Sequence, residues 1–440
     1  MCVKRLMKAL GIVFLAVLMQ SSLFAQTAEI DQRLAELQQQ LDALKAELAA
    51  LKAKPAEAPA PTPAPAAAPA PAAASNVVSA PATAAPANPL AGISSVLGGA
   101  TISGLVDAYY GYNANHPVSG TATTPFTSTD GQFSLNIIEL VLDKTPDKDS
   151  PLGYHVGLGW GQAMDAVNNT DPYATTSSPT KSAQFLKEGY LSYLVPIGKG
   201  LQFDAGKFVT PAGAEVIESN QNWNYTRSLL FYYAIPYYHF GVRAKYTFND
   251  KVAVTGLVVN GWNNIIDNNT AKTGGVSLAL TPNKKLSITE TYIFGPEQNH
   301  DNSDWRHLSD TVVAYTATPK LSLQANVDYG REVKWLVTDK NADWAGVAAY
   351  ARYAFSSKLA LAGRYEYFND HDGWATGTPQ HLNEVTATLE RKVATHIISR
   401  LEYRYDTSNA NFFNRGSTFS KDQNTALAGL IFVLEPSDTK

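Results

Sequence analysis

The sequence predicts an all-β protein: a 16-stranded antiparallel transmembrane β-barrel, preceded by a short N-terminal coiled-coil helix. Two observations predict the barrel. Between residues 100 and 434, segments of about ten residues alternate apolar and polar side chains, with Tyr and Phe near the segment ends. The connections between these segments alternate between short and long, as in barrels with tight periplasmic turns and longer extracellular loops.

Each predicted strand sorts its side chains onto two faces. Successive residues of a strand point to opposite sides, so residues 321–329 place Leu323 and Val327 on one face and Gln324 and Asp328 on the other. One face suits lipid and the other suits water. The alternative is a soluble β-sandwich or propeller, but soluble strands are usually only about five or six residues long.

An even number of segments returns both ends of a barrel to the same side of the membrane. Connections after even-numbered segments are short, as at 196–200, whereas those after odd-numbered segments are long, as at 163–182 and 407–421. We therefore expect the former to be periplasmic and the latter extracellular. The predicted strands cover residues 100–112, 132–143, 152–162, 183–195, 201–209, 238–248, 251–260, 274–282, 285–294, 308–318, 320–330, 344–355, 358–369, 381–391, 395–406 and 424–434.

Three N-terminal segments precede the barrel. Residues 1–25 are typical of a signal peptide, and its removal would take away Cys2, the only cysteine, and with it any disulfide or thiol chemistry. Residues 29–54 carry a leucine heptad seam, which predicts a self-associating periplasmic coiled coil; the alternative is a single amphipathic helix on a membrane or on the barrel. Residues 55–91 are mostly Ala and Pro and predict an extended linker, either a tether or a passive spacer.

Charged residues within the predicted strands indicate which face lines the lumen. An Arg on the lipid face near the bilayer midplane costs about 2–4 kcal/mol, so the strand arginines are expected to point inward. A barrel of this size leaves an aqueous channel. The charges then either shape ion selectivity or simply balance one another in a polar interior. The predicted pore-lining residues are Arg243, Lys245, Arg352, Arg364, Glu366, Glu384, Arg400, Glu402 and Arg404.

The connection at residues 210–237 is too apolar for a solvent-exposed loop. Its run of Leu, Phe and Tyr should bury itself, and the concave surface at hand is the lumen. We expect an inward-folded constriction loop with Glu215, Glu218 and Arg227 as its charged residues. The alternatives are a lid on the rim and a contact between subunits. Trp223 and its neighbours could also stack on sugar rings.

At this point the sequence resembles a known family. Residues 224–231 (Asn-Tyr-Thr-Arg-Ser-Leu-Leu-Phe), 234–236 (Ala-Ile-Pro) and 239–243 (His-Phe-Gly-Val-Arg) are similar to Gram-negative outer-membrane porins of the OmpL-like group. This resemblance implies a cell outer-membrane location, outer-membrane lipid as surroundings and a homotrimer. The N-terminal coiled coil is similar to that of sucrose-type porins.

The resemblance also implies an arrangement of charges in the lumen. In trimeric general porins the third long loop folds inward and sets acidic residues opposite basic ones on the wall. The matching residues here would be Glu215 and Glu218, opposite Arg243 and Lys245.

These observations predict a porin for passive diffusion of small hydrophilic solutes or ions. The alternative is a structural envelope protein that ties the outer membrane to the cell wall peptidoglycan through the coiled coil. No catalytic motif is present, so no enzyme activity and no cofactor are expected. No metal site is expected either, because loop residues such as His300, Asp301 and His371 are more often only solvated. A net charge of −4 disfavours a nucleic-acid partner.

Overall fold

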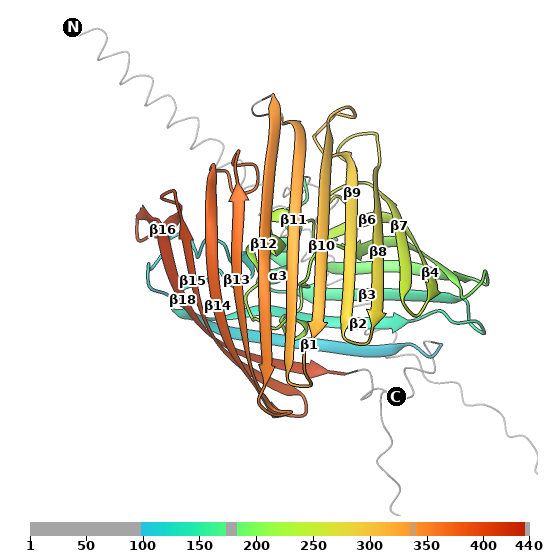
Figure 1. Cartoon of the computed structure of the whole chain (residues 1–440), viewed down its shortest axis with the longest axis horizontal. Helices are drawn as coiled ribbons and strands as arrows, with labels where there is room; N and C mark the ends of the chain where they lie inside the picture. The colour runs from blue at the N-terminus through green and yellow to red at the C-terminus, as the bar shows by residue number, and fades with distance from the viewer. Residues whose placement is uncertain (1–97, 173–182, 336, 338, 436–440) are drawn as a thin grey trace, which may run out of the picture. The chain divides into compact units, whose positions relative to one another are not determined.

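The computed structural model describes residues 98–172, 183–335, 337 and 339–435. These residues form a closed antiparallel β-barrel (Figure 1). The predicted signal peptide, coiled coil and linker lie outside the described residues. Among the described residues, no helix is long and apolar enough to cross a membrane.

All sixteen predicted strands are present in the barrel wall. The strands are β1 Thr101–Asn113, β2 Gln132–Lys144, β3 Leu152–Trp160, β4 Leu186–Val195, β5 Leu201–Val209, β6 Tyr238–Asn249, β7 Val252–Val259, β8 Thr273–Asn283, β9 Leu286–Pro296, β10 Trp305–Thr316, β11 Leu321–Trp335, β12 Lys340–Ala354, β13 Leu359–Asp370, β14 Gln380–Ala394, β15 Ile397–Ser408 and β18 Asp422–Leu434.

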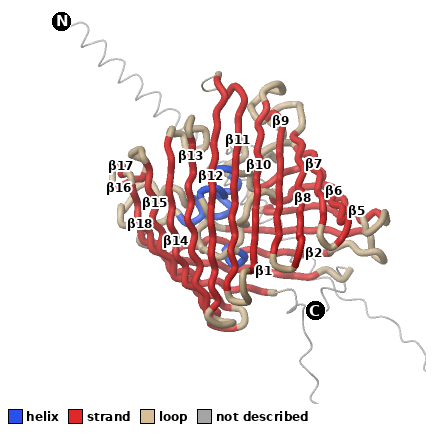
Figure 2. Tube along the Cα trace, viewed as in Figure 1, coloured by secondary structure: helices blue, strands red, loops and turns tan. Residues whose placement is uncertain are grey.

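Short elements that the alternation of apolar and polar residues does not predict lie in the connections. They are η1 Pro125–Thr127, α3 Gln162–Asn168, η3 Ser219–Gln221, η4 Leu230–Ala234, β16 Phe413–Arg415 and β17 Thr418–Ser420. Figure 2 shows the helical turns inside the ring of strands.

Each wall strand pairs with its neighbours in the chain, and the first and last strands close the ring. β1 pairs with β18 from Gly104↔Leu434 to Asn113↔Thr425. β18 also pairs with β15, because the hairpin β16–β17 belongs to the connection between these two strands. Closure leaves no free sheet edge, which a barrel in lipid requires.

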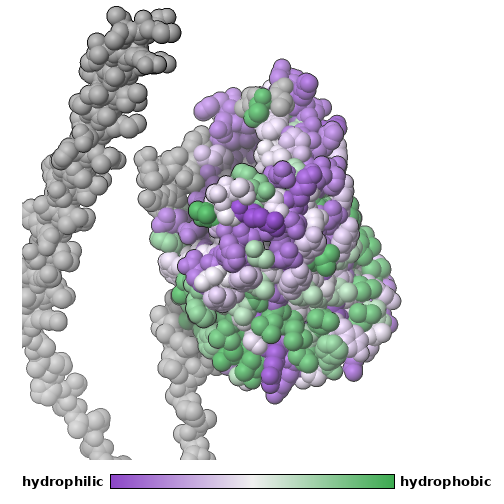
Figure 3. Space-filling model, turned by 90° about the vertical axis from the view of Figure 1, so that its left-hand side faces the viewer, coloured by the Kyte–Doolittle hydropathy of each residue, from purple (hydrophilic) through white to green (hydrophobic). Residues whose placement is uncertain are grey.

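The predicted assignment of faces is confirmed on β15. Leu401 and Tyr403 are 60% and 52% exposed on the outer face, whereas Arg400 and Arg404 are 1% exposed on the inner face. Hydrophobic side chains gather over the lower part of the face seen in Figure 3, with hydrophilic side chains above them. This banding is typical of a surface that lies in lipid.

The connections differ between the two ends of the barrel as predicted, with one exception. Even-numbered strands are followed by tight turns such as 250–251 and 284–285, and we take this end as periplasmic. The connection between β11 and β12, expected to run from 331 to 343, is shorter, because β11 ends only at Trp335 and β12 already begins at Lys340. Both strands continue past the predicted limits, and β12 rises well above its neighbour β13 (Figure 1).

Exchanging Leu401 for Arg tests the lipid-facing assignment. We expect Leu401→Arg to lower the free energy of unfolding in lipid vesicles by about 2–4 kcal/mol, because it places a charge in hydrocarbon near the middle of β15. Thr407→Arg, on the same face but near the strand end, is the matched control and should cost about 0–1 kcal/mol. Equal costs at both positions would contradict the assignment.

Candidate functional site

The long connection between β5 and β6, residues 210–237, folds into the lumen as predicted; we call it the inward loop. Its aromatic side chains pack together inside the barrel. Phe126, from the connection between β1 and β2, lies 5.7 Å from Phe231, 5.3 Å from Tyr232 and 5.8 Å from Tyr237, measured between ring centroids. The apolar run is therefore buried by a second connection that also enters the lumen.

Carboxylates of the wall accept hydrogen bonds from the backbone of the inward loop. The N–H of Tyr225 donates to Glu402 at 2.5 Å, and the N–H of Leu229 donates to Glu366 at 2.7 Å. The N–H of Gly213 donates to Asp310 at 2.9 Å. A loop without regular structure has few partners for its own backbone, so these acids satisfy groups that would be costly to bury unpaired.

Arginines of the wall bind the carbonyl groups of the same loop. Arg400 donates to the carbonyl oxygens of Ser219 at 2.6 Å and Asn222 at 2.7 Å. Arg404 donates to the carbonyl oxygen of Arg227 at 2.7 Å. The wall thus supplies acceptors for the loop N–H groups and donors for its carbonyl groups.

Arg364 is at the centre of this contact and is fully buried. Its guanidinium lies 2.9 Å from Glu215 of the inward loop, 2.8 Å from Glu366 and 2.9 Å from Glu384. It also donates to the carbonyl oxygen of Thr226 at 2.7 Å. Buried charges are tolerated only when they are paired and hydrogen-bonded, and every side of this guanidinium has a partner.

Two wall glycines allow the loop to lie against the barrel. A Cβ at Gly346 of β12 would come within 2.3 Å of the Leu230 side chain, and a Cβ at Gly429 of β18 would come within 2.5 Å of Tyr225. Any larger residue at either position would push the loop away. The wall therefore leaves room for the inward loop at these two glycines, in addition to pairing with its polar groups.

Three of the predicted pore-lining residues do not contact the inward loop. Arg243 pairs with Asp204 at 2.8 Å, and Arg352 pairs with Glu390 at 2.9 Å. Lys245 is exposed on the inner face of β6. The other six predicted pore-lining residues, Arg364, Glu366, Glu384, Arg400, Glu402 and Arg404, point inward but are buried.

The charged residues of the inward loop are paired differently from the arrangement that the resemblance implied. Glu215 contacts Arg364, and Glu218 contacts Lys187 of β4, so neither pairs with Arg243 or Lys245. Arg227 bonds carbonyl groups of its own loop, including that of Val216 at 3.1 Å. Arg227 thus stiffens the loop from within.

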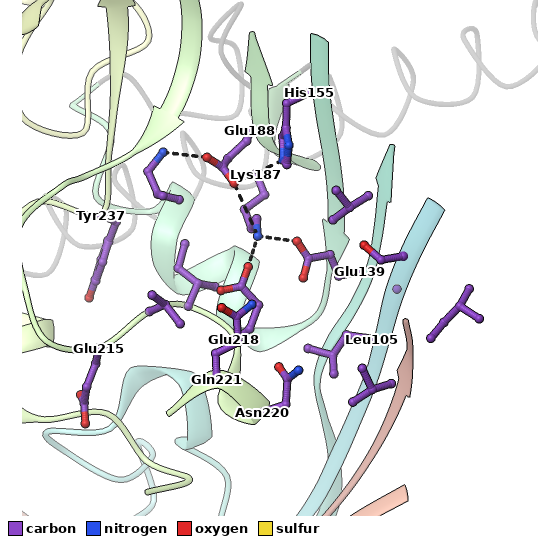
Figure 4. Close-up of a pocket in the computed structure, with 18 of the residues that line it drawn as sticks. Leu105, Glu139, His155, Lys187, Glu188, Glu215, Glu218, Asn220, Gln221 and Tyr237 are labelled. Carbon is purple, nitrogen blue, oxygen red and sulfur yellow. Dashed lines mark hydrogen bonds and ion pairs between the residues drawn. The ribbon is translucent and has the colours of Figure 1, made fainter. Parts of the chain in front are cut away.

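Below the inward loop lies a cavity of about 490 Å³, which we call the inner vestibule. Lys187 is at its centre and contacts both Glu139 and Glu218, and Glu188 lies 3.5 Å from His155 (Figure 4). The cavity is bounded by the first residues of β1 and the last of β18, so it faces the periplasmic end of the barrel. Its lining includes Leu105, Glu139, His155, Lys187, Glu188, Glu215, Glu218, Phe231 and Tyr237.

Sequence reasoning missed Lys187 because a β-bulge breaks the alternation on β4. Strand pairing shifts between Gly157 and Leu158 of β3, which leaves Lys187 as an extra residue beside Glu188. Both side chains are buried on the inner side, although strict alternation places them on opposite faces. The sequence signal for this bulge was the adjacent Lys-Glu pair, since strict alternation would place one of the two charges on the lipid face.

Above the inward loop lies a second cavity of about 410 Å³, the outer vestibule. It is walled by the connections that follow odd-numbered strands, so it faces the extracellular end. Tyr237 lines both cavities and therefore marks where they approach each other. The lining of the outer vestibule includes Tyr232, Tyr233, Tyr237, Trp262, Asn263, Asn268, Glu297, Asn299, Arg306 and Trp374.

Glu297 lies in the connection after β9 and is a buried acid of the outer vestibule. Its carboxylate accepts hydrogen bonds from the Thr273 hydroxyl and from the N–H of Trp262, at 2.5 and 2.7 Å. Burial raises the pKa of Glu297 to about 7, although Arg306 and these hydrogen bonds oppose the change. The charge of this cavity therefore changes near neutral pH. Among the described residues, no group of three or more His, Cys, Asp and Glu side chains could hold a metal ion.

Comparison with known proteins identifies the family. The family model "Putative beta-barrel porin-2, OmpL-like" matches residues 99–434. The chain belongs to this porin family. As an OmpL-like porin it is an outer-membrane channel for passive diffusion, so family and fold point to a channel rather than an enzyme. None of the curated proteins compared with this sequence matches it.

Solved porin structures share the fold of this OmpL-like porin. The anion-selective porin from Comamonas acidovorans has 8% sequence identity and a TM-score of 0.52, over 76% of this chain and 99% of that one. OmpF from Salmonella typhi, in complex with daunomycin, has 13% identity and a TM-score of 0.51, over 76% and 97%. The trimer form of OmpT from Vibrio cholerae has 13% identity and a TM-score of 0.50, over 76% and 98%.

Trypsin cleavage after Arg227 tests how the inward loop is held, because Arg227 is the only Lys or Arg in residues 210–237. The double variant Arg364→Ala/Arg400→Ala leaves loop carbonyl groups without donors, at about 1–3 kcal/mol each. We expect cleavage after Arg227, followed by mass spectrometry, to become at least about tenfold faster.

The matched control for this experiment is Arg352→Ala/Lys245→Ala, which removes two inward-facing cations that do not contact the inward loop. Its cleavage rate after Arg227 should equal that of the unchanged protein. Equal rates in both double variants would show that the wall arginines do not hold the loop.

The raised pKa of Glu297 predicts a pH-dependent outer vestibule. As pH rises above 4.5, the unfolded chain loses this proton first and the folded protein keeps it until about pH 7. Local stability should therefore be greatest below pH 4.5 and fall by up to about 3 kcal/mol as pH approaches 7. Amide exchange at Trp262 measures this fall, and Glu297→Gln should abolish it. A persisting slope in that variant would assign the effect elsewhere.

Proposed function

We propose that this porin admits small hydrophilic solutes and ions through the outer and inner vestibules, which approach each other beside Tyr237. The observation that carries this proposal is the position of the inward loop, with a polar cavity on each side of it. A solute entering from outside would meet the outer vestibule, pass the inward loop and leave through the inner vestibule.

The predicted pore-lining residues would then act in two ways. The buried set around Arg364, Arg400 and Arg404 would position the inward loop and so set the width of the passage. Arg243, Lys245 and Arg352 would act on the electric field near the periplasmic end, because they remain partly or fully exposed to the lumen.

The charge of the inner vestibule would favour cations on the periplasmic side. Glu139, Glu188 and Glu218 outnumber Lys187 among the charges that face this cavity, with His155 as the other basic group. A cavity lined by an excess of one sign concentrates ions of the opposite sign.

We further propose that the barrel assembles as a homotrimer surrounded by outer-membrane lipid and carries out no catalysis of its own. The fold shared with the trimer form of OmpT supports the trimer. The outward-facing apolar side chains support lipid contact. We also propose that the N-terminal coiled coil contacts peptidoglycan. Deleting residues 29–90 should then weaken the attachment of the outer membrane to the cell wall, whereas the conductance of the barrel should stay intact.

Single-channel conductance in a planar bilayer tests the proposed pathway. The purified full chain should give discrete steps, and Tyr237→Ala should raise their size several-fold, because the side chain between the two vestibules is removed. Tyr403→Ala, on the lipid-facing side of β15, is the control and should leave the steps unchanged. A folded protein without steps would contradict the proposed function, and unchanged steps in Tyr237→Ala would contradict the pathway.

A further inference from the structure

A cluster of three tryptophans borders the outer vestibule, which Trp262 and Trp374 line and behind which Trp344 is buried. Trp344 of β12 and Trp374 of the connection after β13 are stacked, with ring centroids 3.9 Å apart and planes 7° from parallel. Trp262, from the connection after β7, stands nearly perpendicular to both rings, at 6.3 Å and 6.1 Å. Three separate parts of the chain thus meet to form one aromatic surface.

Hydrogen bonds hold this aromatic surface in place. The indole N–H of Trp344 donates to the carbonyl oxygen of Ala234 in the inward loop at 3.1 Å. The backbone N–H of Trp262 donates to Glu297. The cluster is therefore attached to the inward loop and to the connection after β9, and its geometry is set before any solute arrives.

Arg306 of β10 adds hydrogen-bond donors to the aromatic surface. Its guanidinium carbon lies 5.0 Å from the Trp262 ring centroid and 4.7 Å from that of Trp374. The Nε–H donates to Glu332 at 2.5 Å. Within the described part of the chain, its two terminal nitrogens make no hydrogen bond, so they can donate to a solute in the outer vestibule.

The net charge beside this surface is small. Glu332 is fully buried and neutralises Arg306. Glu297, whose pKa is raised to about 7 by burial, holds its proton through most of the acidic range. An anionic solute would therefore gain little from Arg306, whose charge is already balanced. A neutral solute with hydroxyl groups would accept hydrogen bonds from the free N–H groups of Arg306 without bringing an unbalanced charge into the cavity.

Polar amides complete the lining. Asn263, Asn268 and Asn299 face the same cavity, and Asn268 is fixed by donating to the carbonyl oxygen of Glu297 at 2.8 Å. A cavity of about 410 Å³ falls within the usual range of about 300–1,000 Å³ for small-molecule sites. Planar apolar surface, amide groups and free N–H donors are thus present together.

We propose that the outer vestibule is a binding site for a neutral mono- or disaccharide. A sugar ring would place its apolar C–H face against the half-buried Trp262, while its hydroxyl groups would accept hydrogen bonds from Arg306 and from the side-chain amides of Asn263 and Asn299. This inference rests on the proposed channel function and names the class of solute that the channel selects at its extracellular entrance.

Sugar block of the ion current tests this inference in the full chain. Glucose, maltose and sucrose, added to the extracellular side, should reduce single-channel current at millimolar concentrations. Gluconate, an anion of similar size to glucose, should block at least tenfold less well. Stronger block by gluconate than by all three sugars would overturn the proposal in favour of an anion site.

Two variants and one control locate the site. Trp262→Leu and Arg306→Gln should each raise the half-blocking sugar concentration at least tenfold, and heat-modifiability on a gel verifies that each barrel is folded. Trp305 is next to Arg306 in the sequence but is 41% exposed on the outer face. Sugars should therefore block the current of Trp305→Leu at the same concentrations as in the unchanged protein. Unchanged block in both folded variants would place sugar binding elsewhere.

Tryptophan fluorescence of the detergent-solubilised protein separates the two proposals. Maltose should change the emission even if no current flows. A protein that binds maltose but gives no conductance steps would therefore contradict the channel function and leave the sugar site intact. Normal conductance steps with neither current block nor fluorescence change would overturn the sugar site and leave the channel function intact.

Discussion

The structure depends on one set of contacts, in which charged side chains of the barrel wall satisfy the backbone of the inward loop. An irregular segment inside a barrel has peptide groups that neither water nor regular structure satisfies. Glu402 and Glu366 accept hydrogen bonds from its N–H groups, and Arg400 and Arg404 donate to its carbonyl groups. Since these side chains lie on rigid strands, the loop takes up one position across the lumen.

Such buried charges contribute more to geometry than to stability. Moving ion pairs out of water costs about as much as their attraction returns, but removing one partner leaves an uncompensated charge. Arg364 joins Glu215 of the inward loop to Glu366 and Glu384 of the wall, so loop and wall cannot separate without exposing unpaired charges. This contact divides the lumen into two vestibules with different chemistry: an acidic one towards the periplasm and an aromatic, nearly neutral one towards the outside.

The sequence was enough to predict the barrel, its sixteen strands and the inward loop, because alternation and apolar runs report directly on lipid and burial. The faces of Leu401 and Arg400 follow from the cost of a charge in lipid. Whether Arg400 meets water or a loop depends on contacts far apart in sequence, such as that with Ser219, which no local pattern reveals. The β-bulge at Lys187 and the extra length of β11 and β12 were missed for the same reason, since local strand pairing overrides strict alternation and expected loop lengths. The cluster of Trp262, Trp344 and Trp374 joins three distant segments.

Amide hydrogen exchange of the full chain in lipid vesicles tests the central claim most directly. If wall side chains hold the inward loop, the amides of Gly213, Tyr225 and Leu229 should be protected about as strongly as strand amides of β13 and β15. Exchange of these three amides at the rate of an exposed segment such as 299–303 would contradict the account, because it would show that the loop leaves the wall.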